Sequence, residues 1–211
     1  MLHLKNRPCV IVGGGAISAR KVDGLLDAGA QVTVISPDLH PSLEALAEVN
    51  QITVKQVAYT SGMLAMLHPF LVFAATDDPT VNQQIAEEAR ALGAPVNVAD
   101  EQGDRDFMNM ATVQRGDITI AISTSGASPA LVGHLQRQIA ELISDEYMTL
   151  SEWMADARPI VQANIKSQPE RAALWHRVLE SSILDRLRQG DTTAARQLFD
   201  QLIHEALDHS A

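Results

Sequence analysis

Three consecutive glycines directly after a short apolar stretch are the residues of this sequence whose chemistry is easiest to recognise. Residues 10–18 read Val-Ile-Val-Gly-Gly-Gly-Ala-Ile-Ser. A strand that ends in glycines and continues into a helix presents bare N–H groups at the helix N-terminus, where they bind the pyrophosphate of a dinucleotide. Gly13 and Gly15 match the first two glycines of the dinucleotide-binding fingerprint, and Ser18 replaces the third. The pattern favours a dinucleotide site, and a glycine-rich turn without a ligand is the alternative.

A carboxylate follows the next apolar stretch. Asp38 lies about 25 residues after Gly13, where an acidic side chain accepts hydrogen bonds from the adenosine ribose and repels a 2′-phosphate. No arginine adjoins Asp38 in the sequence, so the pattern favours NAD over NADP. The other interpretation is an ordinary turn residue, because residues 36–38 read Ser-Pro-Asp.

Two more apolar stretches end in polar residues. Residues 74–78 read Ala-Ala-Thr-Asp-Asp, and their small side chains would let a cofactor approach the backbone. The two aspartates could cap the following helix, and both roles are compatible. Asp100 ends the stretch at 96–100 and could accept a proton at the same sheet edge, or it could be an ordinary polar loop residue.

The elements that must position these residues alternate between strand and helix over the first hundred residues. We expect strands at 8–12, 32–35, 52–57, 70–75 and 95–98, and helices at 15–28, 41–49 and 79–92. This order predicts a parallel sheet with right-handed crossovers.

Beyond residue 100 the pattern changes. Two strand-like stretches at 107–113 and 117–123 predict a hairpin around Arg115 and Gly116. A helix is expected from Pro129, with Ser128 as its cap. It carries one apolar stripe, formed by Leu131, Leu135, Ile139, Leu142 and Ile143. Because this stripe has no obvious partner in the first domain, we expect a dimer. The last 60 residues have helical periodicity.

Charge and cysteine content narrow the class of protein. The 211 residues carry a formal net charge of −10, which disfavours nucleic acid as a partner. The single cysteine, Cys9, excludes an intrachain disulfide, and its place in the first strand predicts a core residue. We see no leader-like stretch and no apolar run near the roughly 20 residues that span a bilayer. The seven histidines lack metal-ligand spacing. We therefore expect a cytoplasmic protein without a membrane partner or a metal site.

Five segments in this order resemble those of the precorrin-2 dehydrogenase family, which includes the dehydrogenase–ferrochelatase half of siroheme synthase and stand-alone enzymes. They are residues 13–21, 36–40, 74–78, 96–100 and 125–129. The resemblance is close over residues 1–150 and loose beyond. It implies a homodimer that oxidises precorrin-2, a tetrapyrrole, to sirohydrochlorin with NAD. In some members Fe²⁺ is then inserted to give siroheme.

The resemblance also assigns roles to particular residues. The family's NAD contacts correspond to Gly15, Ala16, Ile17, Ser36, Pro37, Asp38 and Thr76, and the strand ends add Gly13, Ala75 and Asp77. The family's essential aspartate corresponds to Asp100, as a proton acceptor or a group that orients the macrocycle. Ser128 matches a serine at the active-site rim that is phosphorylated in some relatives. Because the substrate carries several carboxylates, we add Asn97, Arg115 and Arg137 as substrate contacts, with Arg20 and Lys21 as further candidates.

The predicted fold class is α/β, in three parts. Residues 1–113 would form an NAD-binding Rossmann-type domain with a parallel sheet, 114–150 an α+β dimerisation region and 151–211 a helical C-terminal domain. Two other functions fit the glycine turn: an NAD-sensing regulatory module that dimerises through its helical tail, and a dehydrogenase for a small hydroxy acid. The segments at 96–100 and 125–129 favour the tetrapyrrole enzyme over both.

Overall fold

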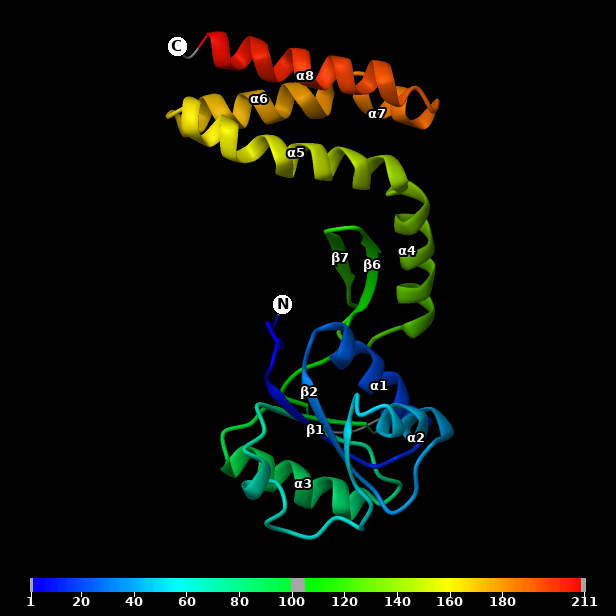
Figure 1. The fold of residues 1–211 in the computed structure, drawn as a ribbon. Helices are drawn as coiled ribbons and strands as arrows, with labels where there is room; N and C mark the ends of the chain where they lie inside the picture. Colours follow the sequence, from blue (N-terminus) through cyan, green and yellow to red (C-terminus); the bar gives the residue numbers. More distant parts are fainter. Residues whose placement is uncertain (1, 100–104, 210–211) are drawn as a thin grey trace. The chain divides into compact units, whose positions relative to one another are not determined.

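A computed structural model describes residues 2–99 and 105–209 of the chain (Figure 1). The chain forms two compact units, Met1–Asn109 and Met110–Ala211. The division falls a few residues before the expected domain end at 113, because residues 111–113 pair with residues 120–122 of the following strand. Among the described residues, no helix is both long enough and apolar enough to cross a bilayer.

The first unit contains a five-stranded parallel sheet with the order β3-β2-β1-β4-β5. Its strands are β1 (Pro8–Val12), β2 (Gln31–Ile35), β3 (Thr53–Lys55), β4 (Leu71–Ala74) and β5 (Val96–Val98). The chain proceeds from β1 to one side of the sheet and returns to the other side at β4, so the strand order reverses between β1 and β4. In open α/β sheets a crevice forms at this point, outside the carboxyl ends of the strands. The predicted α/β fold with a Rossmann-type sheet is confirmed.

Helices cover both faces of the sheet. Alternate residues of β1 divide between two cores: Cys9 and Ile11 pack with α1 (Ala16–Asp27) and α2 (Pro41–Glu48), whereas Val10 and Val12 pack with α3 (Pro79–Ala91). A strand covered on both faces is apolar throughout, as β1 is. Cys9 is fully buried, and burial raises the pKa of its thiol to about 11. Cys9 is therefore a core residue, as predicted.

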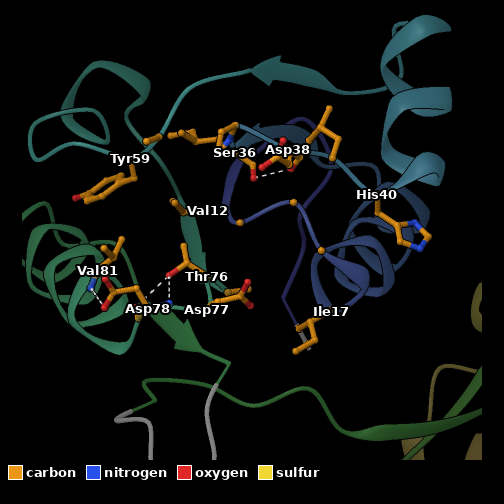
Figure 2. A pocket seen from close by; sticks show the side chains of 18 of the residues that line it. Val12, Ile17, Ser36, Asp38, His40, Tyr59, Thr76, Asp77, Asp78 and Val81 are labelled. Carbon is orange, nitrogen blue, oxygen red and sulfur yellow. Dashed lines mark hydrogen bonds between the residues drawn. The ribbon is translucent and has the colours of Figure 1, made fainter.

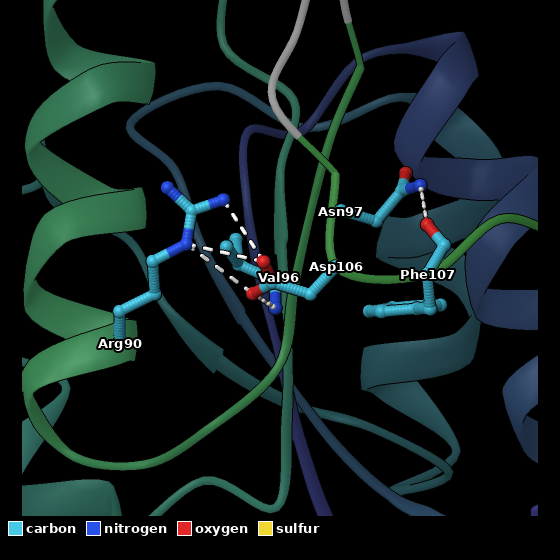
Figure 3. A network of polar contacts seen from close by, with 5 residues as sticks. All are labelled: Arg90, Val96, Asn97, Asp106 and Phe107. Carbon is cyan, nitrogen blue, oxygen red and sulfur yellow. Dashed lines mark hydrogen bonds and ion pairs between the residues drawn. The ribbon is translucent and has the colours of Figure 1, made fainter.

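The segment after β5 differs from the prediction. Instead of starting a strand at residue 107, the chain is held against β5: the Asp106 carboxylate accepts a hydrogen bond from the Val96 N–H at 2.9 Å and pairs with Arg90 at 3.0 Å (Figure 3). Phe107 then packs edge-on against Phe73, with ring centroids 5.2 Å apart. These contacts fix residues 106 and 107 to the first unit, so the hairpin begins only at Ala111.

The second unit combines a hairpin with five helices. The hairpin pairs β6 (Ala111–Arg115) with β7 (Ile118–Ile122), and Gly116 turns between them with a φ of +54°. The helices are α4 (Pro129–Leu142), α5 (Asp145–Asn164), α6 (Gln168–Glu180), α7 (Ile183–Arg188) and α8 (Thr192–Asp208). The last four enclose a core around Leu150, Leu174 and Phe199. None of the residues of α4 is fully buried, and Leu131 and Leu142 of its apolar stripe are exposed.

Candidate cofactor site

A cavity of about 740 Å³ lies at the carboxyl ends of β1, β2 and β4 (Figure 2). The loops that follow these strands supply most of its wall. All ten residues predicted to contact a cofactor line it: Gly13, Gly15, Ala16, Ile17, Ser36, Pro37, Asp38, Ala75, Thr76 and Asp77. Residues from three segments of the sequence therefore meet at the crevice that the strand order creates.

The three glycines of the turn have three different surroundings. A Cβ placed on Gly13 would lie 2.1 Å from the carbonyl oxygen of Ala75, and its φ of +114° disfavours any side chain. A Cβ on Gly14 would lie 2.0 Å from the carbonyl oxygen of Asp38. Gly15 has a φ of −80°, which any residue can adopt, and a Cβ there would meet no atom of the described residues within 4 Å. The fold thus requires Gly13 and Gly14, whereas Gly15 leaves open space at the cavity.

Helix α1 begins at this open space. Gly15 is its N-cap, and within the described part of the chain no side chain caps this end and no acidic residue stands in the first turn. The first N–H groups of the helix are thus available to an anion, which the helix dipole also favours. Ser18, in place of the third fingerprint glycine, is fully buried, which agrees with close packing of helix against sheet. The residues present fit a dinucleotide pyrophosphate.

The loop after β2 is held against the glycine turn. The Ser36 hydroxyl donates to the carbonyl oxygen of Asp38 at 2.7 Å, and the His40 N–H donates to the carbonyl oxygen of Gly14 at 2.7 Å. His40 also caps α2 by accepting from the Ser42 N–H. These bonds fix the backbone around Asp38, whose exposed side chain lies at the cavity wall (Figure 2).

The loop after β4 is fixed by an asparagine that sequence reasoning missed. Asn82, 3% exposed in α3, accepts from the Thr76 N–H at 3.0 Å and from its hydroxyl at 2.8 Å, and donates to the Thr76 carbonyl at 2.9 Å. Asp78 caps α3 by accepting from the N–H groups of Thr80 and Val81, so this aspartate does have the expected capping role. Asp77 is exposed and lines the cavity. In the sequence, these contacts are indicated only by the position of Asn82, four residues after the N-cap residue Asp78.

Tyr59 also lines the cavity and was not predicted (Figure 2). Its hydroxyl donates to Glu88 on α3, and the same carboxylate accepts from the N–H groups of Gly62, Leu64 and Ala65. Burial alone would raise the pKa of Glu88, but these hydrogen bonds outweigh it and lower the pKa. Burial, together with the neighbouring carboxylate, raises the pKa of Tyr59. Glu88 therefore holds the loop that carries Tyr59.

The cavity has an acidic character. Asp38, Asp77 and Asp78 contribute carboxylates, and none of the described lining residues is a lysine or an arginine. A pyrophosphate would therefore be held by backbone N–H groups and the helix dipole. A second phosphate elsewhere on the ligand would find carboxylates in the wall but no lysine or arginine among the described lining residues.

The residues predicted for substrate binding fall in both units. In the first unit, Asn97 is 5% exposed and accepts from Lys21 at 3.0 Å. In the second unit, Ser128 caps α4, Arg137 is exposed, and Arg115 donates to the carbonyl oxygens of Gln114 and Ala140. Asp100, the predicted catalytic residue, lies outside the described residues. Within the described ranges, no group of three or more His, Cys, Asp or Glu side chains could hold a metal ion.

Comparison with known proteins agrees with this architecture. Residues 1–111 match the family model described as "Putative NAD(P)-binding". Residues 115–142 match "Sirohaem biosynthesis protein central", and residues 146–203 match "Sirohaem synthase dimerisation region". Fold, glycine turn and first match together define a protein with an NAD(P)-binding domain. The three matches in this order, together with the relatives described below, show more: the chain belongs to the family of siroheme synthase and precorrin-2 dehydrogenase.

Individual relatives show how much of them the chain covers. Siroheme synthase of Methylobacillus flagellatus is 36% identical over 203 residues, which are 96% of this chain and 43% of the relative. That of Nitrosococcus oceani is 36% identical over 194 residues, 92% of this chain and 41% of the relative. The chain thus spans less than half the length of these curated relatives. Among solved structures, "SirC, precorrin-2 dehydrogenase" matches with a TM-score of 0.74 and 25% identity, over 95% of this chain and 98% of that one.

Proposed function

We propose that this chain is a dehydrogenase that oxidises precorrin-2 to sirohydrochlorin with NAD as hydride acceptor. The observation that carries the dehydrogenase assignment is the uncapped start of α1 beside Gly15, which leaves room for a pyrophosphate at the switch point of the sheet. The substrate assignment is supported by the likeness to a precorrin-2 dehydrogenase over nearly all of both chains. The same likeness does not favour an NAD-sensing module.

The cofactor, when bound, accepts a hydride from the tetrapyrrole. The chain's own residues bind and orient the two reactants. The N–H groups at the start of α1 would hold the pyrophosphate, and the backbone beside Thr76, fixed by Asn82, forms another part of the cavity wall. Oxidation also releases a proton, and Asp100 follows β5 in the sequence. We assign to Asp100 the role of accepting this proton or orienting the macrocycle.

Asp100→Ala tests this assignment. The variant should lose sirohydrochlorin formation and keep the NAD affinity and the unfolding midpoint of the wild type, because no predicted cofactor contact changes. Turnover near that of the wild type would remove Asp100 from the mechanism. Asp104→Ala, which changes another acidic residue of the same segment, is the matched control and should retain activity.

The choice of NAD over NADP rests on charge. The 2′-phosphate of NADP would lie near Asp38, in a cavity whose described residues supply three carboxylates and no lysine or arginine. Like charges at short distance oppose binding. We therefore infer that the cavity discriminates against the 2′-phosphate.

Dimer formation, iron insertion and the remaining substrate contacts complete the proposal. The match to a dimerisation region and the exposed leucines of α4, Leu131 and Leu142, support a homodimer. Asn97, Arg115, Ser128 and Arg137 are proposed contacts of the tetrapyrrole. In iron insertion, Fe²⁺ would be a second substrate. The cytoplasmic location expected from the sequence stays a prediction.

Anaerobic incubation with precorrin-2 tests the proposal. Addition of NAD should convert the spectrum of precorrin-2 to that of sirohydrochlorin, and subsequent addition of Fe²⁺ should give siroheme if the chain also inserts iron. A sirohydrochlorin spectrum that Fe²⁺ leaves unchanged would limit the activity to oxidation. Absence of any change with NAD would refute the proposed function.

A further inference from the structure

Tyr59 contributes the only phenylalanine, tyrosine or tryptophan ring among the described residues that line the cofactor cavity (Figure 2). It follows β3, which ends at Lys55. Ala58 and Val81 of α3 line the cavity as well, and the side chains of Tyr59 and Val81 pack against the same hydrophobic core. The cavity thus has an apolar, aromatic part of its wall in addition to its carboxylates.

The strand order indicates which half of a dinucleotide would lie at Tyr59. In the sheet, β2 and β3 lie on one side of β1, and β4 and β5 lie on the other. With the pyrophosphate at the start of α1, directly after β1, the two nucleosides would lie on opposite sides of this point. An acidic residue after β2 marks the adenosine side, and Asp38 stands there. Tyr59, which follows β3, belongs to the same side, so the base near it would be adenine.

The hydroxyl of Tyr59 is already used within the protein. It donates to Glu88, and a phenol has one proton to donate. Burial raises the pKa of Tyr59, and the hydrogen bond to the Glu88 carboxylate and its charge raise it further, so the hydroxyl keeps its proton at neutral pH. What Tyr59 offers to a ligand is therefore its ring.

The loop that carries this ring is fixed by the same carboxylate. Glu88 accepts from the N–H groups of Gly62, Leu64 and Ala65 at 3.0, 2.9 and 3.2 Å, and the side chain of Leu64 is fully buried. An aromatic side chain that is held in place loses little conformational freedom on binding, so its contact with a ligand contributes more to affinity.

We propose that the ring of Tyr59 stacks on the adenine of NAD and thereby supplies affinity for the adenosine half of the cofactor. The inference rests on the proposed function, because it names one contact of the proposed cofactor. Adenine is uncharged at neutral pH and has a π-face, so carboxylates in the same cavity do not oppose it. Tyr59 would contribute affinity, whereas Asp38 would contribute the preference for NAD over NADP.

Equilibrium titration with ADP-ribose tests the proposal, because this probe contains the adenosine half of NAD and lacks the nicotinamide. Tyr59→Leu keeps an apolar side chain and removes the ring, so the Kd for ADP-ribose should rise about 5- to 30-fold. Tyr59→Phe keeps the ring, and the loop retains its three N–H bonds to Glu88, so its Kd should stay within about threefold of the wild type. Met66→Leu is the matched control, because Met66 lies in the same loop, is 70% exposed and is not a lining residue of the cavity. It should bind like the wild type.

Nuclear magnetic resonance gives a readout that depends on contact and needs no variant to fold. The chain contains two tyrosines, Tyr59 and Tyr147, so protein labelled in its tyrosine rings gives two sets of ring signals, which Tyr59→Phe assigns. In the wild type with ADP-ribose, nuclear Overhauser effects should connect the Tyr59 ring with the H2 or H8 proton of adenine. Tyr147, which is not among the lining residues of the cavity, is the internal control and should show no such effect.

The outcomes separate this inference from the proposed function. A wild type that binds neither NAD nor ADP-ribose would refute the proposed function itself. A wild type that binds both, without nuclear Overhauser effects between Tyr59 and adenine, would overturn this inference alone. Wild-type affinity for ADP-ribose in Tyr59→Leu would overturn it too. Equal weakening in Tyr59→Leu and Tyr59→Phe would assign the effect to the lost hydroxyl and would also contradict stacking.

Discussion

Glycine can be required in the turn by the fold or by a bound ligand, and replacing single glycines with alanine distinguishes these two reasons. At Gly13 the fold forbids a side chain, because the φ is +114° and a Cβ would lie 2.1 Å from the Ala75 carbonyl oxygen. At Gly15 the φ is −80° and the space is open. We attribute the glycine at 15 to the ligand, and the two alanine variants should therefore fail in different ways.

The structure sets the expected magnitudes. Gly13→Ala combines a strained φ, which costs about 1–3 kcal/mol, with overpacking that costs a similar amount, so the free energy of unfolding should fall by about 3 kcal/mol or more. Gly15→Ala should change it by no more than about 1 kcal/mol, because the smaller freedom of the unfolded chain offsets a poorer N-cap. The methyl group would stand where the pyrophosphate approaches, so the Kd for NAD should rise at least about tenfold.

Urea denaturation and calorimetric titration with NAD measure the two effects. Gly24→Ala is the matched control: Gly24 lies in α1, and a Cβ there would meet no atom of the described residues within 4 Å. This variant should gain about 0.5–1 kcal/mol from helix propensity and bind NAD like the wild type. Wild-type NAD affinity in Gly15→Ala would refute the reasoning, because the open space would then have no ligand to explain it.

Three further predictions concern the cavity wall, the loop at Tyr59 and the helix α4. Asp38→Asn removes a carboxylate from the wall, so the preference for NAD over NADP in equilibrium binding should narrow by about tenfold, and an unchanged ratio would contradict the charge argument. Glu88→Gln should lower the free energy of unfolding by about 1–3 kcal/mol, because four donors lose a charged acceptor. Since the folded-state pKa of Glu88 lies below its ordinary value of 4.5, its stabilisation is present above pH 4.5 and is lost as the pH falls through the folded-state pKa. Acid should therefore destabilise the wild type more than the variant in urea titrations, and parallel pH curves would contradict this role. Leu131→Asp with Leu142→Asp changes the two exposed residues of the α4 stripe, which are 47% and 66% exposed. The double variant should convert a dimer to a monomer in light scattering, whereas a wild-type monomer would exclude the dimer.

Much of the cofactor cavity could be predicted because it depends on strand ends. The stretches that form β1, β2 and β4 are mostly apolar and are followed directly by Gly13, Ser36 and Ala75. Parallel strands bring their carboxyl ends to one edge, so residues far apart in the sequence could be placed together. The same logic led to the prediction for Asp100, which lies outside the described residues.

Contacts made by single side chains were beyond sequence reasoning. The fingerprint gives Gly14 no role, yet only the packing of the loop around Asp38 shows why a side chain is excluded there. Tyr59 lines the cavity because its hydroxyl donates a hydrogen bond to Glu88, which lies 29 positions later in the sequence. Hydrophobic periodicity cannot reveal such pairs, because they depend on distances between elements.

At the start of the hairpin, the sequence predicted a strand over residues that are not part of one in the structure. Residues 107–113 form a strand-like, mostly apolar stretch, but Asp106 is bound to Val96 and Arg90, and Phe107 is packed on Phe73. Tertiary contacts therefore override the local pattern over the first residues of the stretch. The strand begins where those contacts end.

A single-turnover experiment tests the central claim most directly. Enzyme preloaded with NAD is mixed with precorrin-2 under anaerobic conditions, and NADH and sirohydrochlorin are followed together. The account predicts that both appear at the same rate and in equal amounts, and that Gly15→Ala needs a higher NAD concentration to reach the same amplitude. Sirohydrochlorin formed without NADH, or a Gly15→Ala variant with the wild-type dependence on NAD, would contradict it.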